Sequence, residues 1–216
     1  MLDWLSLPTI IVVMAFEAIV FFWWLIFFRP RRRMIAGIAI KMRMRFTAHW
    51  RAELRDELSQ SYCMQVGHWP RIYNVISGRQ SGVQFWYCDF SYETGNGGQR
   101  KTHNKSIVMC KCKKELSGMI ALRNEEFSPI GRYRFYQALE LPDWQGPEDY
   151  MFYGQGETIG QLLATPRLAA ILSKSHYDNC ELMGHYLIIF SDRLSRPEKI
   201  ARMILRSLRC AKLLSS

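Results

Sequence analysis

One stretch near the N-terminus constrains this chain more than any other. From Ile10 to Phe28 it runs nineteen residues with a single charge, Glu17, and no uncharged polar side chain. A helix of that length is roughly 28 Å long, which matches a hydrocarbon core of about 30 Å. Because a helix satisfies its backbone hydrogen bonds within one segment, the pattern predicts a transmembrane helix over residues 9–28, after an outer stub of residues 1–8.

The flanks of this segment predict how it is threaded through the membrane. Before it the only charges are the α-amino group and Asp3, whereas four arginines occupy five positions after it. Basic flanks stay on the cytoplasmic side, so we expect the N-terminus outside and the rest of the chain in the cytoplasm. A cleaved signal peptide would carry its basic residues before a shorter apolar core, so the order seen here disfavours cleavage.

The net charge of +10, from 29 Lys and Arg against 19 Asp and Glu, is concentrated next to the apolar segment. Attraction to anionic lipid and the inside-positive rule explain this excess, and no nucleic-acid-binding motif accompanies it. We therefore expect the lipid bilayer, and not nucleic acid, to be a partner. The side chains expected at lipid headgroups are Arg29, Arg31, Arg32, Arg33, Lys41, Arg43 and Arg45.

Residues 29–59 are predicted to form a basic juxtamembrane amphipathic helix. Apolar side chains recur at spacings of three and four from Ile35 to Leu58, with basic residues on the other faces. Two placements stay open, because such a helix either lies on the inner leaflet or packs its stripe on the domain or a partner. The absence of acids favours membrane contact for 34–46, and three acids favour domain packing for 47–59.

Residues 60–216 are expected to be one cytoplasmic α+β domain. β-branched and aromatic runs separated by glycine-rich turns predict an antiparallel meander, with strands at 72–77, 83–92 and 102–112. Shorter strands are expected at 119–122, 133–136 and 150–153, helices over 157–173, a hairpin over 181–190 and a last helix beginning at Pro197.

Several short motifs in this region occur in a characteristic order: Gly67-His68, Asn74–Gly78, Asp89–Gly95, Thr102-His103 and Leu163–Pro166. In that order they resemble a loose group of uncharacterised bacterial membrane-anchored hypothetical proteins, whose hairpin strand ends in a DY-x-Y-x-TG-like pattern. The resemblance covers about residues 67–213 and implies an α+β domain behind an anchor in the bacterial inner membrane. It implies no activity and no site residues.

Three cysteines raise the question of a metal site. Cys110 and Cys112 alternate on one predicted strand, so both thiols face one side, and Cys88 lies on the neighbouring predicted strand. With His103 or His68 these thiols would form a zinc or copper site. The one-residue spacing is atypical of zinc, and buried free cysteine is common in cores, so we favour packing and expect no cofactor.

Two further groups at the predicted hairpin end are candidate sites. A histidine–carboxylate pair drawn from His103, Asp89 and Glu93 could act as a general base, but no glycine-flanked nucleophile accompanies it. The loop Gly95–Lys101 could wrap a phosphate, yet it leads into a strand rather than a helix. We therefore favour structural hydrogen bonding for the first group, an exposed tip able to touch a partner or headgroups for the second, and no catalytic residue.

The acid within the apolar segment points to a protein partner. A carboxylate near the bilayer centre costs a few kcal/mol unless it is protonated or paired. Glu17 is therefore either neutral or in contact with a polar group of another membrane subunit, which we favour. The aromatic side chains of Phe16, Phe21, Trp23 and Trp24 could pack on that partner or on lipid.

These features together predict a non-enzymatic accessory or assembly subunit of a larger integral-membrane complex, anchored by one helix. The alternatives are a membrane-tethered enzyme or metal-binding domain built on His103, Asp89 and the cysteine pair, and a module that binds anionic lipid or nucleic acid through its basic helix. A cytoplasmic domain would keep the six cysteines reduced.

Overall fold

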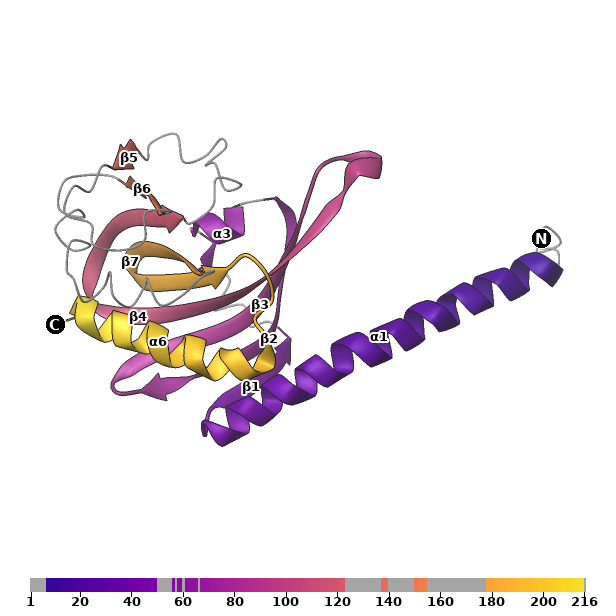
Figure 1. The fold of residues 1–216 in the computed structure, drawn as a ribbon, viewed down its shortest axis with the longest axis horizontal. Coiled ribbons are helices and arrows are strands. Elements are labelled where there is room, and N and C mark those ends of the chain that lie inside the picture. The colour runs from indigo at the N-terminus through magenta and orange to yellow at the C-terminus, as the bar shows by residue number, and fades with distance from the viewer. Residues whose placement is uncertain are drawn as a thin grey trace.

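The computed structural model describes residues 7–49, 56, 58–59, 61–65, 67–122, 137–139, 150–154 and 178–215. Within them, a seven-stranded antiparallel sheet is packed against helices, and one long helix projects from it (Figure 1). The elements in chain order are α1 (Leu7–Lys41), β1 (Arg45–His49), α3 (Tyr62–Gln65), β2 (His68–Gln80), β3 (Val83–Thr94), η1 (Gly97–Gln99), β4 (Lys101–Leu122), β5 (Gln137–Leu139), β6 (Met151–Gly154), β7 (Asp178–Ser191) and α6 (Pro197–Ser215). This architecture confirms the expected α+β class.

Strand β4 is the centre of the sheet. The strand order is β1-β2-β3-β4-β6-β5, and β7 also pairs with β4. The first half of β4 pairs with β3, most of its length pairs with β7, and its last four residues pair with β6. Figure 1 shows β4 curling as it passes from one set of neighbours to the next.

The meander predicted from the sequence is confirmed in β2, β3 and β4. A turn at Ser81 and Gly82 joins the first two strands, and a loop around the short helix η1 joins the second pair. Gly95 opens that loop with φ +82°, and a Cβ there would lie 2.5 Å from the carbonyl oxygen of Gln99. Only glycine tolerates both the left-handed backbone and this close approach.

Helix α1 contains the segment expected to span the membrane, residues 9–28, and continues well beyond it. It runs through Pro30, which removes one backbone donor from the helix. Its C-terminal end packs on the domain, where Ile35 and Ala39 are fully buried, and its N-terminal part projects away (Figure 1). Among the helices of the described residues, none is both long and apolar enough to cross a membrane.

The prediction of a single helix over residues 29–59 is wrong for its middle part, which contains a strand. Residues up to Lys41 continue α1, and Arg45–His49 form the edge strand β1 beside β2. The helix ends at Lys41, and Arg43, with φ +56°, lies in the turn that leads from α1 into β1. Of the described apolar residues in that expected stripe, Met42 and Phe46 pack against one core and Leu58 is buried in the other.

Both faces of the sheet are covered. One core, between the sheet and α6, includes Phe85 and Tyr87 of β3, and the end of α1 completes it. The other core includes Cys88 and Phe90 of the same strand, together with residues of the chain before β2. Alternation along β3 thus places successive side chains in two different cores.

Strand β7 corrects the hairpin expected over 181–190. It is one continuous strand, and Gly184, with φ +52°, lies at a shift in its register with β4. A glycine in the left-handed region makes a bulge here rather than a turn. The last helix is confirmed, with Pro197 first and a buried apolar face. The expected strand at 133–136 and helices over 157–173 lie outside the described residues.

Candidate functional site

The most distinctive polar group in the described structure is a carboxylate in the middle of an apolar strand. Asp89 of β3 has no exposed surface and lies on the same face as Tyr87. Removing a carboxylate from water is costly unless it is paired and hydrogen-bonded. The surroundings of Asp89 must therefore supply a cation and several donors.

Arg31 of α1 supplies the cation. Its Nε donates to Asp89 Oδ2 at 2.8 Å, and its Nη2 donates to Oδ1 at 2.7 Å. Such a two-point contact fixes orientation as well as distance. Its Nη1 also donates to the carbonyl oxygen of Ser195 at 2.8 Å, so one guanidinium joins α1, β3 and the segment that leads into α6.

Three neutral side chains complete the set of donors to Asp89. Asn74 Nδ2 donates to Oδ2 at 2.9 Å, and the hydroxyls of Tyr87 and Ser106 donate to Oδ1 at 2.7 and 3.3 Å. The Ser106 hydroxyl also accepts from the Ser195 amide at 2.9 Å. We call these six residues, Arg31, Asn74, Tyr87, Asp89, Ser106 and Ser195, the Asp89 network.

Two members of the network, Arg31 and Tyr87, have shifted pKa values. Burial raises the pKa of Tyr87 well above its ordinary value, and the charge of Asp89 raises it further. Burial by itself lowers the pKa of Arg31, but its hydrogen bond to Asp89 and the charge of that residue outweigh this and raise it. Arg31 therefore stays charged and Tyr87 stays a neutral donor, as a structural clamp requires.

His103 and Asp89, considered above as a general-base pair, do not come together. His103 lies opposite Tyr92 and stacks on its ring, with centroids 4.9 Å apart. Its Nε2 is 2.7 Å from the hydroxyl of Thr94. Asp89 is paired with Arg31 instead, so the proposed catalytic pair of His103 and Asp89 is not assembled.

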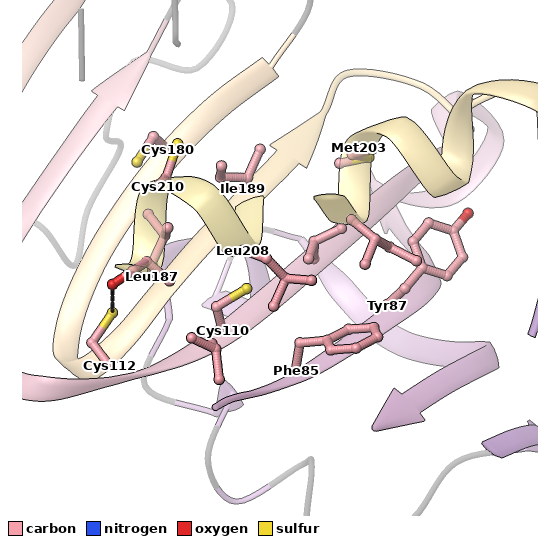
Figure 2. Close-up of a cluster of buried hydrophobic side chains, with 14 of the residues drawn as sticks. Phe85, Tyr87, Cys110, Cys112, Cys180, Leu187, Ile189, Met203, Leu208 and Cys210 are labelled. Atoms are coloured by element: carbon pink, nitrogen blue, oxygen red, sulfur yellow. Dashed lines mark hydrogen bonds between the residues drawn. The ribbon is translucent and has the colours of Figure 1, made fainter. Parts of the chain in front are cut away.

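The cysteines considered for a metal site lie on opposite faces of the sheet. Cys88 belongs to one core, whereas Cys110 and Cys112 belong to the other, together with Cys180 and Cys210 (Figure 2). The described residues contain no group of three or more ligand side chains that could hold a metal ion. The hypothesis of a Cys88, Cys110 and Cys112 site is therefore wrong, because strand parity separates the thiols.

The thiols near α6 are buried and free. Burial raises the pKa of Cys110, Cys112 and Cys180, and it raises the pKa of Cys210 to about 12. A thiol reacts through its thiolate, so these groups behave as small apolar side chains rather than as nucleophiles.

One residue of the expected headgroup set has a different role. Arg31 is committed to the Asp89 network, and its side chain is 14% exposed. The others of that set whose side chains are described are exposed: Arg32, Arg33, Lys41, Arg43 and Arg45. Sequence reasoning missed Arg31, although an acid inside an apolar strand signalled that some cation must lie nearby.

The residues expected to contact a membrane partner lie on the projecting part of α1. Phe16 is 67% exposed, and Glu17 is exposed beside it. Phe21, Trp23 and Trp24 belong to the same helix, but their side chains lie outside what the structure describes.

Comparison with known proteins gives a fold likeness. No protein-family model matches the sequence, and no curated protein matches it either. One solved structure is similar, titled "crystal structure of the mycobacterial trehalose monomycolate transport factor A, TtfA". The TM-score is 0.61 at 10% sequence identity, and the match covers 87% of this chain and 93% of that one. At this identity the likeness shows a shared fold.

Replacing Arg31 by Ala leaves Asp89 buried without its cation, so we expect the free energy of unfolding to fall by about 3–5 kcal/mol. Urea unfolding of the full chain in detergent measures the change. Arg32→Ala, which removes an exposed neighbour, is the control and should change stability by less than about 0.5 kcal/mol. The double change Arg31→Met with Asp89→Asn should recover part of the loss, and equal effects of Arg31→Ala and Arg32→Ala would contradict the clamp.

The buried thiols should resist alkylation in the folded protein. Because burial raises their pKa, the thiolate fraction at pH 8 is far below that of a free cysteine, whose pKa is about 8.5. After brief treatment with iodoacetamide, mass spectrometry should find Cys110, Cys180 and Cys210 unmodified until urea is added. Gln84→Cys, at an exposed position on β3, gives the positive control. If Cys110 in the folded protein were labelled as fast as that control cysteine, its burial in the core would be refuted.

Proposed function

We propose that this protein is a non-enzymatic accessory subunit of a membrane complex, anchored through the N-terminal part of α1. The observation that supports the anchor is a set of large apolar side chains left uncovered on the projecting helix. They are between 48% and 67% exposed: Val12, Val13, Met14, Phe16, Ile19, Val20 and Phe22. Apolar surface on this scale needs lipid or another protein to cover it.

The distribution of these side chains favours lipid on all sides. Val12, Val13 and Met14 are consecutive, and successive residues of a helix point about 100° apart. They therefore cover three different directions around α1 and do not form one stripe. A helix that docks on a protein or lies on a surface has a single apolar face, whereas one apolar all round is buried in a core or a bilayer.

The clamp at the base of the helix supports the same role. Arg31 comes three residues after the apolar segment and ties α1 to Asp89 in the sheet. A protein tethered only for localisation could use a flexible linker, whereas here the anchor and the domain share a buried ion pair. This suits a subunit that must hold its domain in a set orientation to a partner.

The similar solved structure is consistent with an accessory role but identifies no transported molecule for this protein. The neighbour is described as a transport factor, TtfA. A factor that assists transport is an accessory role of the kind proposed. The proposal carries over that role alone, and not trehalose monomycolate.

The anchor has a direct test in the full chain expressed in bacteria. We expect the protein to remain in the membrane pellet at alkaline carbonate, with a C-terminal tag protected from protease added outside intact cells. Ile19→Arg with Val20→Arg should release it, since each arginine at the helix centre adds about 2.5–3.5 kcal/mol to insertion. Leu205→Arg, at an exposed apolar position of α6, is the matched control and should leave the protein in the membrane pellet. Complete extraction of the unaltered chain, or digestion of its tag from outside, would refute the anchor or its threading.

The partner contact has its own test. Glu17→Leu should weaken co-purification of other membrane proteins from gently solubilised membranes while leaving membrane retention intact, because it removes the polar group without reducing hydropathy. Ala18→Leu, on the neighbouring position, is the control and should leave co-purification unchanged. Size exclusion chromatography with mass spectrometry measures the co-purifying proteins for both variants. A monomer recovered from native membranes would count against a subunit role.

A further inference from the structure

A second unusual surface lies where β3 turns into β4. We use the name hairpin tip for His68, Trp69, Arg71 and the residues from Gly95 to Lys101. A cavity of about 260 Å³ opens there, lined by His68, Trp69, Glu93, Gly95, Asn96 and Arg100. None of the Asp89 network contributes to it, so the hairpin tip is distinct from the clamp.

The indole of Trp69 is displayed by an irregular backbone. Trp69 has φ +54°, in a region that a large side chain rarely adopts, and it lies in a register shift between His68 and Arg71. Bulges of this kind redirect a side chain out of the regular alternation. Trp69 is 59% exposed, and the guanidinium of Arg100 lies 4.8 Å from its ring centre. A strained backbone that exposes a tryptophan points to a ligand for that side chain.

The charge around this indole is mainly positive. Arg71, Arg100 and Lys101 are all exposed, and Glu93, which lines the cavity, is half-buried. An exposed tryptophan in contact with one arginine, with two more exposed basic residues close in the chain, suits a membrane–water interface, where the ring lies at headgroup level and the cations meet phosphate. The cavity is smaller than the roughly 300–1,000 Å³ typical of small-molecule pockets, so a single phosphate-sized group suits it better than a larger ligand.

The hairpin tip also faces the direction in which the anchor leaves the domain. Figure 1 shows the β3–β4 hairpin extending from the sheet on the same side as the projecting part of α1. The β2–β3 turn lies at the opposite end of the sheet. A membrane that receives α1 would therefore lie nearer to the hairpin tip than to that turn.

We propose that the hairpin tip is a second membrane contact, which places Trp69 at the interface and Arg71, Arg100 and Lys101 on the phosphates of anionic lipid headgroups. The inference rests on the proposed anchor and extends it. It gives the membrane-bound domain two attachment points, one apolar and permanent, the other electrostatic and sensitive to lipid composition and salt.

The test uses the full chain in nanodiscs, with an environment-sensitive dye on Gly98→Cys in a Cys63→Ser background. Nothing lies within 4 Å of a Cβ at Gly98, and the other described cysteines are buried. With anionic lipid present, nitroxides on lipid headgroups should quench the dye at Gly98 strongly. The same dye on Gln84→Cys, near the β2–β3 turn, should be quenched little.

Charge reversal gives a second test of the contact between the hairpin tip and anionic lipid. Arg100→Glu with Lys101→Glu should lower the ratio of docked to undocked hairpin at least about fivefold, the effect of one basic residue at an anionic surface. Lys113→Glu with Lys114→Glu, exposed positions farther along β4, are the matched control and should not change it. Equal quenching at Gly98 and Gln84, or quenching at Gly98 only with a protein partner present, would overturn the inference. Failure of the chain to enter nanodiscs would refute the anchor itself, which distinguishes the two.

Discussion

A carboxylate without exposed surface has to be neutralised where it lies, and Arg31 neutralises Asp89. The pair determines more than its own stability, because the same guanidinium also holds the carbonyl that precedes α6. Helix α1 is therefore positioned against the sheet and α6 by one side chain, and the burial of Ile35 and Ala39 one and two turns later completes the joint. A buried ion pair often adds little net stability compared with an apolar replacement, so its value here is geometric.

The fold was predictable wherever short-range signals decide it. Glycine-rich turns and β-branched runs define the meander, and Pro197 marks the start of α6. The two errors have one cause, since both depend on strand pairing between distant segments. Arg45–His49 reads as helix because its apolar spacing continues that of α1, yet pairing with β2 outweighs local periodicity. Gly184 reads as a turn, but β4 continues past it and keeps β7 extended on both sides.

The site was less predictable than the fold. That Asp89 needs a cation follows from its position between Cys88 and Phe90, but which cation depends on how a helix 58 residues earlier crosses the sheet. The cysteines show the same limit. Cys110 and Cys112 share a face because two residues apart on a strand always do, whereas the register of β3 against β4 decides where Cys88 points. Spacing within one strand can be read from a sequence, and register between strands cannot.

A domain held by one helix has a remaining freedom that the clamp does not remove. Arg31 ties α1 to the sheet and to Ser195 at the joint, but a helix inserted as proposed would still be free to rotate about its own axis and carry the domain with it. A second contact away from that axis is needed to fix this rotation, and the hairpin tip is the part of the described structure that extends in the right direction (Figure 1). The contact proposed for it is electrostatic, so salt or neutral lipid would weaken that contact while the proposed anchor stays inserted. The face that the domain presents to a partner would then depend on the lipid beside it.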